Sequence, residues 1–172
     1  MTIRVGINGF GRIGRLVVRA VKQHRELTLA HINEANAPAT TSAHLLEFDT
    51  IHGRFDADVS AKDGADGTGV IEIDGDAVTH SSLDTPGAVD WAGADVDLVL
   101  ECSGRFRTPD LLAPYLAQPA VGVGRLHKRH PLRHRGRAVH HGGRRPDDQS
   151  VGLVRQRVRL RPPDGRPGWV GG

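Results

Sequence analysis

Three glycines near the start of the chain have the spacing of a phosphate-binding turn. Gly9, Gly11 and Gly14 form the pattern G-x-G-x-x-G within residues 8–14. In such a turn the first glycine permits a tight bend, the second lets a pyrophosphate approach the backbone, and the third lets a helix pack closely on a strand. Free backbone N–H groups at the start of the helix then bind the phosphates. The pattern therefore predicts a site for a dinucleotide.

A carboxylate stands where the ribose of such a ligand needs one. Glu34 follows a second apolar run, residues 27–32, about 20 positions after the glycines. A carboxylate at the end of this second strand can accept the ribose hydroxyls, and it would repel the 2′-phosphate of NADP, so it favours NAD. The alternative is a glycine-rich turn without a ligand. A lone G-x-G-x-x-G would favour that alternative, but the flanking strands, helix and acid favour a dinucleotide.

The elements needed to hold these residues follow from the apolar pattern. Residues 3–7 alternate apolar and polar side chains, which is typical of a buried strand. Residues 96–100 are continuously apolar, as expected for a central parallel strand. Apolar residues at helical spacing follow the glycines, and these are Ile13, Leu16, Val17, Ala20 and Val21. This alternation predicts an α/β fold with an incomplete Rossmann-like parallel sheet and flanking helices.

Three further elements are predicted in the middle of the chain. A helix is expected over residues 43–48, with Thr41 or Ser42 as its cap. Residues 70–79 have the pattern of a β-hairpin around an Asp-Gly turn. The sequence T-P-D at residues 108–110 is typical of a helix start, because it combines a capping residue, a proline and an acid in the first turn.

The charge distribution divides the chain into two regions. Residues 1–118 carry 10 Lys and Arg against 17 Asp and Glu, whereas residues 119–172 carry 13 against 3. The second region is rich in Arg, His, Gly and Pro and has almost no apolar periodicity, so we expect a disordered basic tail. We therefore predict a dinucleotide-binding domain over residues 1–118, no further strand after Leu116, and a tail over residues 119–172.

Other bulk properties bear on location and chemistry. A chain of 172 residues suits one domain. Its single cysteine, Cys102, excludes an intrachain disulfide and suits the cytoplasm. There is no apolar run long enough for a membrane helix and no signal-peptide core, so a cytoplasmic protein is expected. The pair His140-His141 could hold a metal loosely, but a solvated polar run is the favoured interpretation, and no metal site is predicted.

Residues 1–116 resemble the N-terminal, NAD-binding part of the glyceraldehyde-3-phosphate dehydrogenase family. The segments that carry the resemblance are IRVGINGFGRIGRLVVRA, HINEANAPATTSAHLLEFDTIHGRF and DVDLVLECSGRF. It implies that Arg12 and Ile13 contact the pyrophosphate through backbone N–H groups and that Glu34 binds the adenosine ribose. Ser103 and Gly104 would face the nicotinamide. The expected cofactor-binding set is Asn8, Gly9, Phe10, Gly11, Arg12, Ile13, Gly14, Glu34, Ser103 and Gly104.

Two departures from the family pattern concern the strength of NAD binding. The family commonly has Asp where this chain has Glu34, and the extra methylene moves the charge. The family also often has Arg before an Asp-Pro pair near the adenine, where Ser82-Leu83-Asp84 stands here. Both changes alter the contacts expected for the adenosine half of the cofactor.

The resemblance also implies a reaction for intact family members. They oxidise glyceraldehyde 3-phosphate with NAD and phosphate, using a cysteine thiolate that a nearby histidine keeps ionised. Both groups belong to a second domain with no counterpart in residues 119–172. Cys102 is interpreted as a small packing residue, so no catalytic residue is predicted. The expected function is that of a truncated, inactive NAD-binding fragment. Intact members are homotetramers, whereas this fragment is expected to be monomeric or to aggregate through exposed apolar surface.

Two other functions stay open from the sequence. The chain could be an active NAD-dependent dehydrogenase that uses other residues and acts on glyceraldehyde 3-phosphate or erythrose 4-phosphate, because relatives of both kinds share these motifs. It could also bind nucleic acid through the basic tail. That tail supplies charge but has Trp169 as its one aromatic residue and no RNA- or DNA-binding motif, so nucleic acid is the less favoured partner.

The tail resembles family sequence read in the wrong frame. Synonymous codons can be chosen for residues 152–161 so that a reading frame shifted by one base yields G-W-Y-D-N-E-C-G-Y. The C-terminal signature of the family is W-Y-D-N-E-W-G-Y. We therefore expect that the open reading frame joins the N-terminal domain to the 3′ end of the gene, out of frame, across a deletion.

Overall fold

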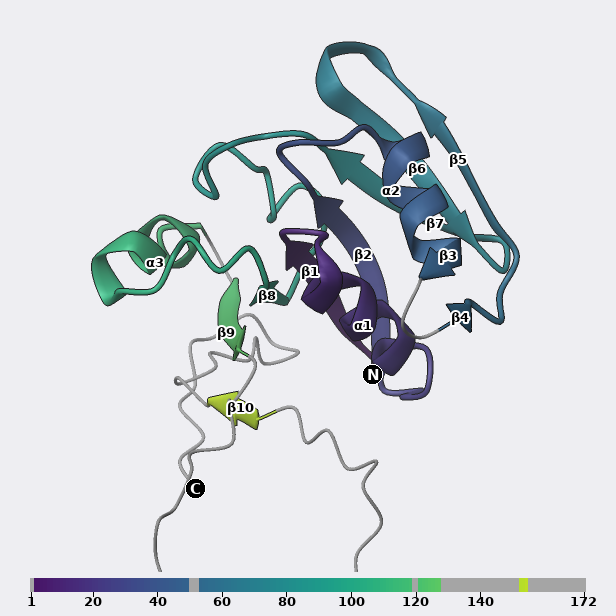
Figure 1. Cartoon of the computed structure of the whole chain (residues 1–172). Helices are drawn as coiled ribbons and strands as arrows, with labels where there is room; N and C mark the ends of the chain where they lie inside the picture. The colour runs from purple at the N-terminus through teal and green to yellow at the C-terminus, as the bar shows by residue number, and fades with distance from the viewer. Residues whose placement is uncertain (1, 50–52, 119–120, 128–151, 155–172) are drawn as a thin grey trace, which may run out of the picture.

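The computed structural model describes residues 2–49, 53–118, 121–127 and 152–154, and Figure 1 shows how their elements are arranged. The helices are α1 (Arg12–Val21), α2 (Ala39–Glu47) and α3 (Pro109–Leu116), with one 3-10 turn at Ala65–Gly67. The strands are β1 (Ile3–Asn8), β2 (Leu27–Asn33), β3 (Phe48–Asp49), β4 (Gly53–Arg54), β5 (Val59–Asp63), β6 (Thr68–Ile73), β7 (Asp76–Ser81), β8 (Leu98–Glu101), β9 (Gly122–His127) and β10 (Gly152–Val154).

Within these residues, one eight-stranded sheet has the strand order β10-β9-β8-β1-β2-β7-β6-β5. The central strand β1 pairs in parallel with β2 on one side and with β8 on the other. β2 continues in parallel to β7, and β8 continues in parallel to β9. The prediction of an α/β fold with a Rossmann-like parallel sheet is confirmed. Because β2 and β8 lie on opposite sides of β1, the order of the strands reverses at this point.

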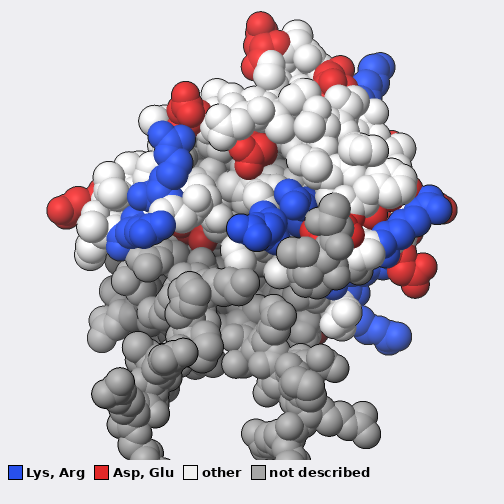
Figure 2. All heavy atoms as spheres, in the orientation of Figure 1, with Lys and Arg blue, Asp and Glu red and all other residues white. Residues whose placement is uncertain are grey.

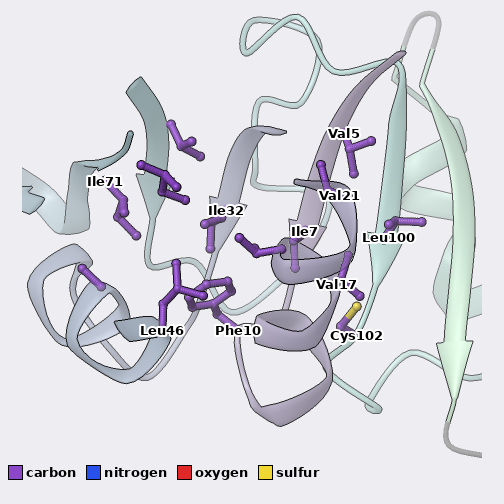
Figure 3. Packing of buried hydrophobic residues seen from close by; sticks show 14 of the residues in the cluster. Val5, Ile7, Phe10, Val17, Val21, Ile32, Leu46, Ile71, Leu100 and Cys102 are labelled. Carbon is purple, nitrogen blue, oxygen red and sulfur yellow. The ribbon is translucent and has the colours of Figure 1, made fainter. Parts of the chain in front are cut away.

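Helices α1 and α2 cover one face of the sheet (Figure 1). Val17 and Val21 of α1 pack on the buried side chains of β1, in the 3.6-residue spacing that the sequence predicts. Leu46 of α2 belongs to the same core, and Figure 3 shows it beside Phe10. The apolar stripes of two helices and one sheet face thus form a single core.

The opposite face is covered without a regular helix pair. Trp91 is fully buried there together with Tyr115 of α3 and Val99 of β8. The Trp91 Nε1–H donates to the Pro86 carbonyl at 3.0 Å, which satisfies the one polar group of this side chain. The irregular segment between β7 and β8 therefore takes the place of a packing helix.

The predicted hairpin is confirmed as β6 and β7, which pair antiparallel. Two residues connect the strands, Asp74 with φ +52° and Gly75 with φ +86°. Positive φ at both central positions matches the right-handed twist of paired strands, which is why Asp-Gly is a strong hairpin signal.

Helix α2 begins earlier than predicted, at Ala39 with Pro38 as its N-cap residue, and the expected capping role of Thr41 or Ser42 is wrong. The cause is tertiary. Asp63 of β5 accepts the Thr40 backbone N–H at 3.0 Å and the Thr40 hydroxyl at 2.7 Å, so a distant carboxylate satisfies the start of the helix.

The expected end of the sheet after Leu116 is also wrong. Strand β9 follows α3 and pairs in parallel with β8, from Leu98 opposite Gly122 to Glu101 opposite Arg125. The pairing supplies hydrogen bonds that composition does not reveal, and Val123 is buried in the core beneath α3. Apart from β9, residue 121 and β10, the predicted tail lies outside the described residues.

Candidate cofactor-binding site

The predicted cofactor residues meet at the carboxyl ends of β1, β2 and β8. The glycine turn follows β1, Glu34 follows β2, and the segment Ser103-Gly104 comes two residues after β8. In open α/β sheets, ligands bind outside the carboxyl ends of the strands, where the strand order reverses. The structure therefore brings the three predicted motifs together at the position where this kind of sheet binds a dinucleotide.

The three glycines have different structural constraints. Gly9 has φ +88°, and a Cβ atom on it would overlap the backbone of Ser103. A Cβ atom on Gly14 would overlap the carbonyl oxygen of Gly9, so this glycine lets α1 lie close to the turn. A Cβ atom on Gly11 would meet nothing within 4 Å. Gly9 and Gly14 are thus required by the fold, whereas the space at Gly11 is open for a ligand.

The N-terminus of α1 is suited to an anion. Gly11 is the N-cap residue, with no side-chain cap, and the first turn contains no acidic residue. The leading backbone N–H groups, including those of Arg12 and Ile13, carry the positive end of the helix dipole. Figure 2 shows a group of Lys and Arg side chains near the middle of the described surface on the α1 face. The charge of the backbone therefore favours phosphate at this end of the helix.

Glu34 lies directly beside the glycine turn. Its Oε2 accepts the backbone N–H of Phe10 at 2.6 Å, and its Oε1 accepts the backbone N–H of Asn36 at 3.0 Å. The longer side chain, compared with Asp, is long enough to reach back to the turn. The carboxylate thus stabilises the turn and places a negative charge directly beside it.

The side chain of Asn8 is polar and is buried below the turn. Its Nδ2 donates to Glu101 Oε2 at 2.7 Å and to the Tyr115 hydroxyl at 2.6 Å. Its Oδ1 accepts the Asn33 Nδ2 at 2.8 Å. The sequence prediction did not identify Asn33, Glu101 or Tyr115, whose polar groups are buried at three separate strand and helix positions. The signal was available in a polar residue at the end of each apolar strand.

The segment after β8 is held by Glu101. Glu101 Oε1 accepts the Ser103 backbone N–H at 2.7 Å and also the Ser103 hydroxyl. The Ser103 Oγ in turn accepts the Arg105 backbone N–H at 3.1 Å, and Gly104 follows with φ +72°. The Ser103 hydroxyl is therefore engaged within the protein, and its backbone lies against Gly9.

Cys102 has the properties of a packing residue. It is 9% exposed and belongs to the core under α1, where Figure 3 shows it beside Val17. Burial, and secondarily the negative charge of Glu101, raises the pKa of its thiol to about 12. The thiol is therefore protonated at neutral pH and lacks the ionisation that nucleophilic catalysis needs.

The described residues show neither a metal centre nor a membrane span. They contain no group of three or more His, Cys, Asp and Glu side chains arranged to hold a metal ion. No helix in the described ranges has the length and apolar character to cross a membrane.

The fold and the site define a dinucleotide-binding domain of the Rossmann type. Residues 3–109 match the family model described as glyceraldehyde 3-phosphate dehydrogenase, NAD binding domain. The chain belongs to this family, and the cofactor of its Rossmann-type domain is NAD.

Curated relatives agree with this family. The chain is 50% identical over 115 residues to glyceraldehyde-3-phosphate dehydrogenase 3 of Nostoc sp., which covers 67% of this chain and 33% of the relative. It is 38% identical over 123 residues to glyceraldehyde-3-phosphate dehydrogenase 1 of Mucor circinelloides, and this match covers 72% of this chain and 35% of the relative. It is 40% identical over 116 residues to glyceraldehyde-3-phosphate dehydrogenase of Lactococcus lactis, and this match covers 67% of this chain and 33% of the relative. The chain thus spans about a third of the length of these relatives.

Proposed function

We propose that this 172-residue chain binds NAD at the carboxyl edge of its sheet and does not itself catalyse a dehydrogenation. The observation that carries the proposal is the placement of Glu34 beside the Phe10 N–H of the glycine turn, 2.6 Å away. That contact joins a ribose-binding carboxylate and a phosphate-binding turn in one structure, which is the combination that a dinucleotide requires.

Each part of the cofactor has a group to hold it. The backbone N–H groups of Arg12 and Ile13 would bind the pyrophosphate, and Glu34 would accept the hydroxyls of the adenosine ribose. Ser103 and Gly104 would lie along the nicotinamide half, across the point where the strand order reverses. NAD supplies a hydride acceptor when it is bound, and the residues of this chain bind and orient it.

Calorimetric titration of the full chain tests this proposal. NAD should bind, and NADP should bind at least about tenfold more weakly, because its 2′-phosphate would face the Glu34 carboxylate at close range. Glu34→Gln keeps the side-chain length but removes the negative charge, so it should reduce the difference in affinity between NAD and NADP. Glu26→Gln is the matched control, because this exposed carboxylate lies before β2 and should leave both affinities unchanged. Absence of heat with NAD, or equal affinities of the unmodified chain, would contradict the proposal.

A second prediction concerns catalysis. The relatives' reaction needs a thiolate, and Cys102 is buried, protonated and packed against α1, so no acyl-enzyme can form on it. We expect no NADH from glyceraldehyde 3-phosphate and phosphate when the protein is made in a host without its own enzyme. Turnover that disappears in Cys102→Ser would show that Cys102 is a nucleophile. Turnover that persists in that variant with the same specific activity would show that other residues of the chain catalyse, once purification to constant activity has excluded a contaminant.

We also propose that the region after β9 is coding sequence read out of frame. The matches to the three relatives cover 115 to 123 residues of the chain. Synonymous codons can be chosen for residues 152–161 so that a one-base shift yields G-W-Y-D-N-E-C-G-Y, which resembles the C-terminal signature of the family. The nucleotide sequence around codons 116–130, compared with an intact copy of the gene, decides this. A deletion junction there supports the proposal, and uninterrupted homology in the present frame contradicts it.

A further inference from the structure

A buried carboxylate connects the two halves of the cofactor site. Glu101, the last residue of β8, is 1% exposed. Its Oε2 accepts hydrogen bonds from Asn8 Nδ2 at 2.7 Å and from the Tyr115 hydroxyl. Its Oε1 accepts the Ser103 N–H at 2.7 Å and the Ser103 hydroxyl. The four donors are neutral groups, so hydrogen bonds rather than a salt bridge stabilise the buried carboxylate.

The donors come from three separate parts of the site. Asn8 immediately precedes the first glycine of the turn, and Ser103 begins the segment whose backbone lies against Gly9. Tyr115 is fully buried on α3, on the face of the sheet opposite α1. Burial and the nearby Glu101 carboxylate raise the pKa of the Tyr115 hydroxyl, so it keeps its proton and remains a donor. Glu101 therefore bonds to the last residue of β1, just before the turn, to the segment after β8 and to α3.

The network also continues toward the adenosine side. Asn8 Oδ1 accepts from Asn33 Nδ2 at 2.8 Å, and Asn33 Oδ1 accepts the Ser81 hydroxyl at 2.8 Å and the Leu83 N–H at 3.0 Å. Asn33 directly precedes Glu34. The adenosine side thus has an anchor of its own on β7, whereas the Ser103 segment is bonded to Glu101.

We propose that Glu101 is a positioning residue for the nicotinamide half of NAD, and that Tyr115 makes this positioning depend on the docking of α3. The inference rests on the proposed NAD binding. Glu101 holds the Ser103 N–H and hydroxyl on one oxygen and the turn and α3 on the other. An amide at this position has one acceptor oxygen, so it leaves one pair of donors facing its own NH₂ group. Whichever pair the amide oxygen keeps, Glu101→Gln no longer joins the segment after β8 to both Asn8 and Tyr115, and the position of that segment against Gly9 is less firmly fixed.

The test uses the full chain and two ligands, NAD and ADP-ribose, which lacks the nicotinamide ring. Glu101→Gln should weaken NAD binding about 10-fold and leave ADP-ribose binding within about 2-fold, because hydrogen bonds to charged groups are strong and only the nicotinamide half depends on this one. Tyr115→Phe keeps the buried ring and should give a smaller loss of about 3- to 5-fold, again for NAD alone. Ser42→Ala is the control, since it removes a buried hydroxyl that bonds to His80 and not to any member of the Glu101 network.

A measurement without ligand separates positioning from general stability. The Ser103 amide donates to Glu101, so its hydrogen exchange should accelerate in Glu101→Gln and stay slow in Ser42→Ala. If the affinities for NAD and ADP-ribose fall equally, Glu101 is merely structural and the inference is wrong. The inference is also wrong if neither affinity changes in Glu101→Gln or in Tyr115→Phe. If Glu101→Gln does not fold, Tyr115→Phe provides the test. A loss of affinity for NAD alone supports the inference, and an equal loss for both ligands contradicts it. If the unmodified chain binds neither ligand, the proposed function itself fails.

Discussion

Gly14→Ala should destabilise the protein, whereas Gly11→Ala should leave it folded and unable to bind NAD well. A Cβ atom at position 14 would overlap the carbonyl oxygen of Gly9, and backbone atoms on both sides cannot move apart easily. Overpacking of this kind costs about 1–3 kcal/mol, which is a large part of the stability of a small domain, about 5–15 kcal/mol. NAD binding should be lost with the turn.

At position 11 the same methyl group meets no protein atom within 4 Å. The free energy of unfolding should therefore fall by at most about 1 kcal/mol, since Gly11 is the N-cap residue of α1 and Ala is a poorer cap. The added methyl group would occupy the space that the pyrophosphate needs, so NAD affinity should fall about 10- to 100-fold. Urea unfolding and calorimetric titration of the two variants measure both effects. Unchanged NAD affinity in Gly11→Ala would show that the pyrophosphate lies elsewhere.

Acid should destabilise the fold between about pH 6.5 and pH 4, and His31 should account for much of the loss. His31 is 6% exposed, with Nδ1 2.7 Å from the Thr79 hydroxyl and Nε2 2.9 Å from the Ser81 hydroxyl. Its ring meets the Trp91 ring edge to face at 5.3 Å. Burial, and secondarily the neighbouring His80, lowers the pKa of His31 to about 4.

The direction of the effect follows from the two states. In the unfolded chain His31 takes up a proton near pH 6.5, but in the fold it stays neutral down to about pH 4. Its buried, neutral form therefore contributes stability that is complete above pH 6.5 and is lost as the pH falls toward 4, about 3 kcal/mol in all. Burial also lowers the pKa of His80, which adds a loss of the same sign.

Urea unfolding at pH 7, 5.5 and 4.5 measures this dependence. His31→Gln can still bond to the two hydroxyls but does not titrate, so its stability should fall less steeply over this range. The matched control is His24→Gln, because His24 is exposed and its replacement should keep the steep fall. The prediction fails if the imidazole signals of His31 in the folded protein titrate near pH 6.5 by nuclear magnetic resonance.

The sequence by itself determined the parts of this protein that depend on local conformation. The glycine turn, the apolar face of α1 and the Asp74-Gly75 hairpin were all predicted, because positive φ angles and residue periodicity are properties of short segments. Glu34 could be predicted as well, because in a strand–helix–strand unit the second strand ends about 20 residues after the glycine turn. These features were sufficient for the α/β class and for a dinucleotide at the edge of the sheet.

Only the tertiary structure decided how those parts are held together. Asn8 bonds to Glu101 and Tyr115 across 93 and 107 residues, and no local pattern indicates which strand ends will meet. The start of α2 depends on Asp63, 23 residues from Thr40, and β9 exists because β8 offers it a paired edge. In each case a polar group of the backbone or of a side chain must find a partner, and the partner is determined by the packing of the whole sheet rather than by neighbours in the sequence.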